Sequence, residues 1–304
     1  MFEKFIAAAY GAKLGKLAEY EPLAKHTTLR VGGPARVFIQ PENKDAFVKI
    51  IQLARELGLA FKILGKGSNL LASDDTFEGI VIQTDKGLTQ TKIEGTIVTV
   101  GAGTSDVLLA REVSKQGLAG LEFLSGIPGT IGGAIFMNAG AYKKEIGDVL
   151  TRVQILNEKN ELIWLDKKDL ELSYRTSVFQ KRPDWIIVEA VLQLEVGEAD
   201  EIFATINKRK EKRLTSQPLD LPSAGSTFRN PTGHSAWKLI ADAGLRGYTV
   251  GGAKISEKHT NFVVNAGGAT AKDVAAVIMH VKQVVGEKEG LDMHQEIEFF
   301  NWSK

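Results

Sequence analysis

Apolar and polar positions recur with two different periods along the chain, and together they predict a mixed α and β protein. A helical period, with apolar residues three and four positions apart, runs through residues 2–18, 44–57 and 106–116. Ser105 stands before the last of these segments as an N-cap, and a glycine follows each of the last two as a stop signal. Short apolar or alternating runs predict strands at 61–64, 80–83, 90–93, 96–100, 150–156, 161–165 and 186–194.

The C-terminal third begins with a charged helical segment, residues 200–214, that runs into Pro218 and Pro222. Two further helices are predicted at 236–243 and 270–287, and strands at 250–255, 262–264 and 296–300. Helices and strands do not alternate strictly, which favours an α+β architecture over a doubly wound parallel sheet. We therefore expect one domain over 1–198 and another over 199–293, with residues 294–301 returning to the first as a closing strand.

Composition narrows the classes of function. The 304 residues include no cysteine, which excludes disulfides, thiolate metal sites and cysteine nucleophiles. The formal net charge of +1 gives no reason to expect a nucleic-acid or anionic membrane partner. We find neither an apolar run of transmembrane length nor a signal-peptide pattern, so we expect a cytoplasmic protein. No metal site is expected, because an isolated histidine such as His259 cannot form one.

The segment from Ser125 to Tyr142 holds five glycines and one proline, interleaved with apolar residues. Glycine lets the backbone adopt positive φ and lie directly against a ligand, because it has no Cβ. Exposed N–H groups at a helix start then favour an anion such as a pyrophosphate. The segment predicts a buried loop around a flat, phosphorylated ligand, although a tight glycine crossing inside a core would look similar.

A second glycine turn follows the strand at 61–64, in the sequence Gly65-Lys66-Gly67-Ser68-Asn69. Its spacing fits neither a P-loop nor a dinucleotide fingerprint, so a nucleotide would be bound in another way or the segment is a plain turn. We expect the two glycine segments to hold a pyrophosphate between them. The candidate cofactor-binding residues are Gly65, Gly67, Ser68, Asn69, Leu70, Gly126, Ile127, Pro128, Gly129, Gly132, Gly133, Asn138, Ala139 and Gly140.

Three further side chains are candidates for chemistry, each beside a plainer interpretation. Ser226 lies in a polar loop without a Gly-x-Ser-x-Gly elbow, which favours a proton donor or ligand over a nucleophile, or simply a turn serine. Arg175, after Tyr174 in an apolar stretch, suits a carboxylate but is also compatible with an ordinary surface position. Glu296 alternates with Ile297 on the closing strand, where such glutamates usually face water.

Taken together, these segments resemble the flavin-dependent UDP-N-acetylenolpyruvoylglucosamine reductases of bacterial peptidoglycan synthesis. The resemblance covers nearly the whole chain, and it is specific because many motifs occur in the family's order. These motifs are 27–35, 65–71, 126–142, 174–175, 217–218, 223–231, 251–253, 258–265 and Glu296. The short connection between Arg175 and the strand at 186–194 resembles the subgroup that lacks an extra tyrosine-bearing loop.

The resemblance implies a PCMH-type FAD-binding domain of two α/β subdomains, followed by an α+β substrate domain. It also implies non-covalent FAD, NADPH as hydride donor, a UDP-sugar substrate and a monomer. Arg175, Ser226 and Glu296 would be catalytic, with Ser226 donating a proton to the substrate. A flavin oxidase of the same domain type and a non-catalytic flavin-binding module remain as alternatives.

The resemblance also assigns substrate contacts, which would come from Tyr174, Arg213 and Asn230. Many relatives carry an arginine two residues after the catalytic glutamate, where this chain has Glu298. Lys258, His259 or Arg229 would then supply the missing basic contact to the nucleotide.

Overall fold

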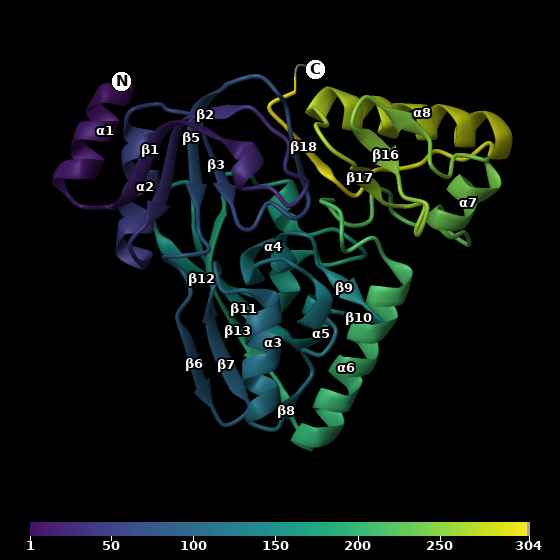
Figure 1. Cartoon of the computed structure of the whole chain (residues 1–304). Helices are drawn as coiled ribbons and strands as arrows, with labels where there is room; N and C mark the ends of the chain where they lie inside the picture. Colours follow the sequence, from purple (N-terminus) through teal and green to yellow (C-terminus); the bar gives the residue numbers. More distant parts are fainter. Residues whose placement is uncertain (303–304) are drawn as a thin grey trace. The chain divides into compact units, whose positions relative to one another are not determined.

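The structure is a computed structural model, and it describes residues 1–302. Its backbone contacts divide the chain into two compact units (Figure 1). Unit 1 consists of Met1–Glu19, Val37–Lys66 and Glu78–Glu211. Unit 2 consists of Tyr20–Arg36, Gly67–Phe77 and the chain from Lys212 onward.

Unit 1 contains two sheets, and the helices come from the segments between their strands. Its helices are α1 (Phe2–Gly11), α2 (Lys44–Glu56), α3 (Asp106–Lys115), α4 (Ile131–Phe136), α5 (Ile146–Val149) and most of α6 (Ala199–Ser216). Its strands are β1 (Gly15–Pro22), β2 (Pro34–Pro41), β3 (Phe61–Leu64), β5 (Phe77–Gln83), β6 (Thr91–Glu94), β7 (Ile97–Gly101), β8 (Leu118–Ala119), β9 (Gly140–Ala141), β10 (Lys144–Glu145), β11 (Leu150–Leu156), β12 (Leu162–Asp166), β13 (Ile186–Gln193) and β14 (Glu195–Val196). The ends of β1, β2 and β5 continue into unit 2.

The first sheet has the strand order β1-β2-β5-β3, with β3 and β5 parallel. Helix α2 begins at an N-cap, Asn43, whose side chain accepts a hydrogen bond from the Ala46 N–H at 3.0 Å. Its apolar face carries Phe47, Ile50 and Ile51, all fully buried in the core of unit 1. Amphipathic periodicity thus fixes how this helix contributes to the core.

The second sheet is antiparallel, in the order β12-β11-β13-β7-β6, and shares the same hydrophobic core. Helix α4 contacts β7 and β13, and α3 contacts the short 3₁₀ turn η2 (Leu124–Gly126). The sheet therefore anchors the end of the glycine-rich stretch that runs into α4, while η2, at the start of that stretch, lies against α3.

Unit 2 is built around a three-stranded sheet and its own buried cluster. Its helices are α7 (Ala236–Asp242) and α8 (Ala271–Glu289), and its strands are β4 (Leu70–Ala72), β15 (Thr249–Val250), β16 (Ala253–Ile255), β17 (Val263–Asn265) and β18 (Glu298–Phe300). A capping box between Thr270 and Asp273 starts α8, and Gly290 ends it in the left-handed conformation. One face of α8 buries Val274, Ile278 and Val281.

The expected helix at residues 2–18 is wrong in its second half. Helix α1 ends at Gly11, and Gly15 opens strand β1 instead. Gly15 has φ +153°, and a Cβ there would lie 2.0 Å from the Gln40 carbonyl oxygen, so the chain must leave helical geometry to pack against β2. The expected single strand at 250–255 is likewise two strands, because Gly251 turns the chain with φ +52°.

The expected division at 198/199 differs from the observed units, which separate near residue 211 within α6. The closing strand β18 does pair with a segment of the first 198 residues, β4, in parallel. That partner strand, however, clusters with the C-terminal part of the chain. Helices in the described part of the chain are too short or too polar to cross a membrane.

Candidate active site

The glycine turn after β3 leaves a run of backbone donors without acceptors. Among the residues that the structure describes, the backbone N–H groups of residues 66–69 donate no hydrogen bond. Gly67 makes the turn with φ +60°, and a Cβ there would lie 2.3 Å from the His26 carbonyl oxygen. Consecutive unsatisfied N–H groups in a turn are the arrangement that binds anions in proteins.

The second glycine segment is held against the residues that follow β7. The N–H groups of Ile131 and Gly132 donate to the carbonyl oxygens of Thr104 (3.0 Å) and Ala102 (2.8 Å). The Asp106 N–H, from the first of these two stretches, donates in return to the carbonyl oxygen of Gly129 at 3.2 Å. Residues 102–106 and 129–132 therefore form a short antiparallel ladder, which fixes the path of the loop before α4.

Gly65 joins the two glycine segments within unit 1. A Cβ at Gly65 would lie 2.4 Å from Thr130 Oγ1, and Thr130 is itself the N-cap of α4. The next residue, Lys66, donates from Nζ to Ser105 Oγ at 2.7 Å. The start of the first segment thus lies against the second, as a shared phosphate site requires.

The glycines of the second segment serve two different purposes. Side chains at Gly129, Gly132 and Gly140 would collide with the protein itself, at 2.4, 3.0 and 2.4 Å, so close packing explains these glycines. Gly133 differs, since the nearest atom to a Cβ there is Thr130 Oγ1 at 3.6 Å. Its missing side chain therefore leaves open space that a ligand could occupy.

Between these glycines the backbone is internally bonded. Gly126 closes η2, and the N–H of Ile127 donates to Leu124 at 2.9 Å while Pro128 has no N–H to offer. Ala139 donates to Ala134 at 2.7 Å and so ends α4. These candidates shape the loop through their backbones.

Asn138 connects the glycine segment to the turn that carries Arg175. Its side chain is fully buried, donates from Nδ2 to the Ser173 carbonyl at 2.9 Å and accepts at Oδ1 from the Gly147 N–H at 3.1 Å. These two hydrogen bonds form a bridge between protein segments, and the cofactor contact of Asn138 stays a prediction. This bridge positions the residue before Tyr174.

Arg175 occupies a strained turn and is held from several directions. The turn is closed by two hydrogen bonds between Ser173 and Thr176, and Arg175 has φ +55°. Its Nη2 donates to the Gly140 carbonyl at 2.9 Å, and the guanidinium lies 4.9 Å from the centre of the half-exposed Tyr174 ring. A guanidinium fixed in this way is pre-organised for a planar anion.

Ser226 and Glu296 come together in unit 2, although they lie far apart in the sequence. The Glu296 N–H donates to the carbonyl of Thr227 at 2.8 Å, and Phe228 bridges antiparallel to Gln295. Ser226 immediately precedes this pairing and is half-buried, as is Glu296. The pairing holds a hydroxyl and a carboxyl on neighbouring backbone segments.

Asn69 braces the same glutamate. Its Nδ2 donates to the Glu296 carbonyl at 3.0 Å, and its own carbonyl accepts from the Glu298 N–H at 3.0 Å. Leu70, the next residue, begins β4 and pairs with Glu298 in β18. Asn69 and Leu70, both candidate cofactor-binding residues, thus also hold the segment of Glu296 and the strand β18 that follows it. Ser68, the candidate before them, is half-buried.

The expected substrate contacts of unit 2 include a pair of basic residues in one place. Lys258 donates from Nζ to the Leu214 carbonyl, which directly follows Arg213. Arg213 itself donates from Nε to Gln217 at 2.9 Å. Asn230 is exposed, and its Oδ1 accepts from the Ala236 N–H at the start of α7.

The imidazole of His259 favours its neutral form. Burial lowers the pKa of its imidazole, the backbone hydrogen bond of His259 raises it and the positive charge of Arg246 lowers it further. Its ring meets Phe262 edge-on, with centroids 4.9 Å apart. The net shift keeps the ring uncharged at neutral pH, so it can contribute hydrogen bonding but not charge.

Sequence reasoning missed a buried asparagine that orders the Ser226 segment. Asn261 is 5% exposed; its Oδ1 accepts from the Phe228 N–H and its Nδ2 donates to the Phe228 carbonyl, both at 2.9 Å. Its backbone carbonyl also accepts from Thr227 at 2.7 Å. The polar residue between Thr260 and Phe262 gives no local signal of this role.

It also missed a group of polar atoms near the glycine segments. Both carboxyl oxygens of Asp106 and the hydroxyl of Thr104 are buried and lack a hydrogen-bond partner in the described residues. Within unit 1, these orphaned atoms, the unsatisfied N–H of Lys66 and the open side of Gly133 fit a phosphate-bearing ligand such as FAD.

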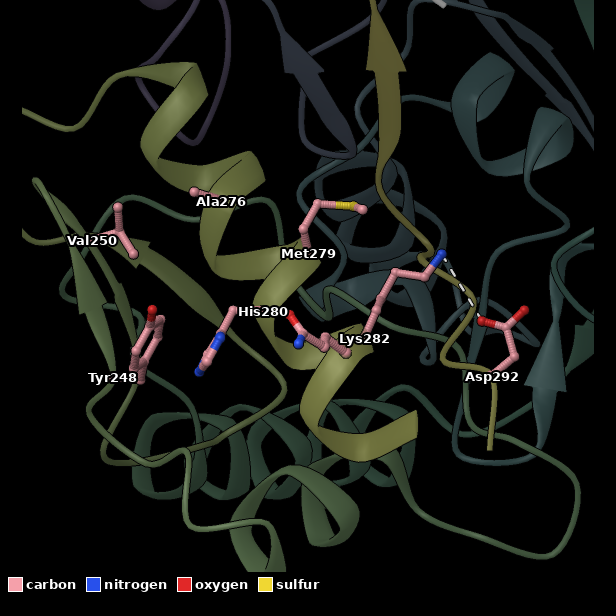
Figure 2. A pocket seen from close by; sticks show the side chains of 8 residues that line it. Tyr248, Val250, Ala276, Met279, His280, Lys282 and Asp292 are labelled. Carbon is pink, nitrogen blue, oxygen red and sulfur yellow. Dashed lines mark ion pairs between the residues drawn. The ribbon is translucent and has the colours of Figure 1, made fainter. Parts of the chain in front are cut away.

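Another hollow lies elsewhere in unit 2 and contains none of the expected site residues. It has a volume of about 600 Å³ and is lined by residues of α8 and of the β15 region (Figure 2). The rings of Tyr248 and His280 stack there, 4.1 Å apart, and Lys282 faces Asp292 at 4.0 Å. The described residues contain no cluster of three or more histidine or acidic side chains that could hold a metal ion.

Comparison with known proteins supports the two-part architecture. Residues 35–166 match the FAD binding domain family, and residues 217–300 match the C-terminal domain family of UDP-N-acetylenolpyruvoylglucosamine reductase. A solved reductase of this name from Thermus caldophilus superposes with a TM-score of 0.79 at 34% identity, covering 94% of this chain and 98% of that one. The expected fold, an FAD-binding domain of this type with an α+β C-terminal domain, is confirmed.

Full-length relatives give the same result. A UDP-N-acetylenolpyruvoylglucosamine reductase of Bacillus subtilis is 45% identical over 99% of this chain and 100% of its own length. One of Anoxybacillus flavithermus is 46% identical over 97% of this chain and 98% of its own. With this identity over nearly its full length, the chain belongs to the UDP-N-acetylenolpyruvoylglucosamine reductase family.

Proposed function

We propose that this protein is an FAD- and NADPH-dependent reductase that converts UDP-N-acetylglucosamine enolpyruvate to UDP-N-acetylmuramate for peptidoglycan precursor synthesis. The observation that carries the proposal is the pairing of residues 227–229 with 294–296, which places Ser226 and Glu296 on neighbouring backbone segments in the unit matched by the reductase's C-terminal family. Membership of the family at 45% identity supplies the reaction class.

Unit 1 would bind the cofactor. Lys66, through its Nζ and its backbone N–H, would hold its phosphates, and the open side of Gly133 would admit its flat part. When bound, FAD supplies hydride chemistry between NADPH and the enolpyruvyl double bond. The protein's own residues would orient the substrate, stabilise the negative charge that develops on its carboxylate and donate the proton to its α-carbon.

Arg175 would bind the enolpyruvyl carboxylate. Addition of hydride to the β-carbon of the double bond pushes negative charge onto this carboxylate. A guanidinium already fixed by Gly140 and Tyr174 needs little reorganisation to stabilise that charge. Tyr174, half-exposed beside it, would add a contact to the substrate.

Ser226 would then transfer its hydroxyl proton to the α-carbon, which completes the addition of hydride and proton across the double bond. Glu296 can assist as a hydrogen-bond donor to the developing enolate only in its protonated form. The Asn261 and Asn69 bridges hold the backbones of these two residues in register, so that neither must be ordered during the reaction.

The UDP part of the substrate would be bound by the basic residues of unit 2. Arg213 and Lys258 suit a diphosphate, since Lys258 contacts the carbonyl of Leu214, the residue after Arg213. Neutral His259 and Asn230 can accept or donate hydrogen bonds. This group would replace the basic contact that Glu298 cannot make.

The test separates the two halves of the reaction. Purified protein should show a flavin absorbance spectrum, and NADPH should bleach it in the absence of oxygen. In Ser226→Ala this bleaching should persist, while reoxidation by the enolpyruvyl substrate should slow by about 10²–10³-fold. Ser235→Ala, an exposed serine of the same unit, is the matched control.

Unchanged reoxidation in Ser226→Ala would contradict the proton-donor role. Reoxidation by oxygen alone, with no response to the enolpyruvyl substrate, would identify a flavin oxidase. A colourless protein that takes up no added FAD would contradict the whole proposal.

A further inference from the structure

The Asp106 carboxyl group is the most unusual polar group of unit 1. Its side chain is completely buried, and neither oxygen has a hydrogen-bond partner among the described residues. The hydroxyl of Thr104, two residues earlier, is buried and unpaired in the same way. An ionised carboxylate held like this would be strongly destabilising, so the group is either neutral or completed by a ligand.

The carboxyl lies directly on the backbone of the second glycine segment. Asp106 is the first residue of α3, and its N–H donates to the Gly129 carbonyl. A Cβ on Gly129 would lie 2.4 Å from Asp106 Oδ2, so only glycine permits this contact. The orphaned oxygens therefore lie against the glycine segment that we expect to bind the cofactor.

Asp106 lies within the electrostatic field of Lys66, the first residue of the anion-binding turn. Lys66 is the charged group whose field acts on the carboxyl, and Thr104, Ser105 and Thr130 contribute uncharged hydroxyls from the adjoining segments. Burial raises the pKa of Asp106 well above its ordinary value, and Lys66 opposes this only in part. Burial therefore favours the neutral form of this group.

We propose that Asp106 is a cofactor-binding residue: a neutral carboxylic acid whose O–H donates to a phosphate oxygen of bound FAD, with the Thr104 hydroxyl as a second donor. The inference rests on the proposed function, since it needs a phosphorylated cofactor in unit 1. Lys66, whose Nζ and backbone N–H both belong to unit 1, balances the phosphate charge. A protonated acid is suited to this position, because an ionised one would repel the phosphate.

The experiment measures FAD affinity of the apoprotein by flavin fluorescence between pH 5 and 9, independently of turnover. Affinity of the wild type should fall as pH rises through the raised pKa of Asp106, since ionisation turns a donor into a repelling charge. Asp106→Asn keeps an N–H donor of the same shape, so its affinity should stay near the low-pH wild-type value and lose that pH dependence. Asp106→Ala should bind about 10- to 150-fold more weakly at pH 5, the loss of one hydrogen bond to a charged group.

Asp45→Asn is the matched control, because Asp45 is an exposed aspartate in the first turn of α2. It should leave the affinity and its pH profile unchanged. Wild-type affinity that rises with pH, together with weak binding by Asp106→Asn, would overturn the proposal in favour of an ionised carboxylate that accepts from a ribityl or ribose hydroxyl. Equal affinity in all variants would reduce Asp106 to a structural residue, whereas a wild type that binds no FAD would refute the proposed function itself.

Discussion

Asn261→Ala tests whether one buried amide orders the reactive segment of unit 2. The substitution removes the partners of both the N–H and the carbonyl of Phe228, and this residue is only 2% exposed. Each buried backbone group left unsatisfied costs about 1–3 kcal/mol, so the free energy of unfolding should fall by roughly 2–5 kcal/mol. The bond from Thr227 to the Asn261 backbone survives, so the segment should loosen without leaving its place.

Two assays are needed, because stability and positioning are separate effects. Urea unfolding followed by tryptophan fluorescence gives the loss of stability. Anaerobic stopped-flow gives the rates of flavin reduction by NADPH and of reoxidation by substrate. Reduction should stay near the wild-type rate, while reoxidation should slow by about 10- to 100-fold, because Ser226 and Glu296 are no longer held in register.

Gln283→Ala is the control, since it removes an exposed amide from α8. Its stability should stay within about 0.5 kcal/mol of the wild type. If Asn261→Ala matched this control in both assays, the hydrogen bonds of the Asn261 amide would neither stabilise the fold nor position Ser226 and Glu296. The reasoning from buried hydrogen bonds would then be refuted.

Two further predictions concern the glycine segments and the imidazole of unit 2. Gly65→Ala should lower the free energy of unfolding by about 1–3 kcal/mol through its collision with Thr130, whereas Gly133→Ala should raise it by about 0.4–1 kcal/mol yet weaken FAD binding. Thermal melts of the apoprotein and FAD titration check both, and tight FAD binding by Gly133→Ala would show that its open side does not face the cofactor. His259→Phe should abolish part of the wild-type loss of stability below about pH 6.5, because a lowered pKa in the folded state favours the neutral ring and that stability disappears as pH falls. Urea unfolding at pH 5.5 and 7.5 gives the measurement, and parallel profiles for the two proteins would contradict it.

Local signals in the sequence predicted local structure well. The helix expected at 270–287 is α8, and the strands expected at 150–156 and 61–64 are β11 and β3. In each case the periodicity and the end signals lie within the element itself. Strand β1 was missed because its conformation depends on β2, which packs against Gly15 from a later part of the chain.

The same distinction between local and long-range signals applies to the residues of the candidate site. Glycine-rich stretches and polar loops stand out in sequence, so the segments around Gly129 and Ser226 were found, and the family resemblance that named their roles is confirmed as membership. The second role of Asn69, bracing the backbone of Glu296, could not be predicted, because it exists only through pairing between distant segments. Asp106 was missed for a related reason, since an aspartate at a helix start is ordinarily exposed.

The parallel pairing of β4 with β18 has a consequence for how the polypeptide is synthesised and handled. Residues 70–72 leave the ribosome long before their partner at 298–300 exists, so unit 2 stays incomplete until residues 298–300 have been synthesised. Truncation of the final strand should expose an unpaired β edge in the middle of the chain, and an isolated fragment starting at residue 212 should lack the strand on which its own last strand is built.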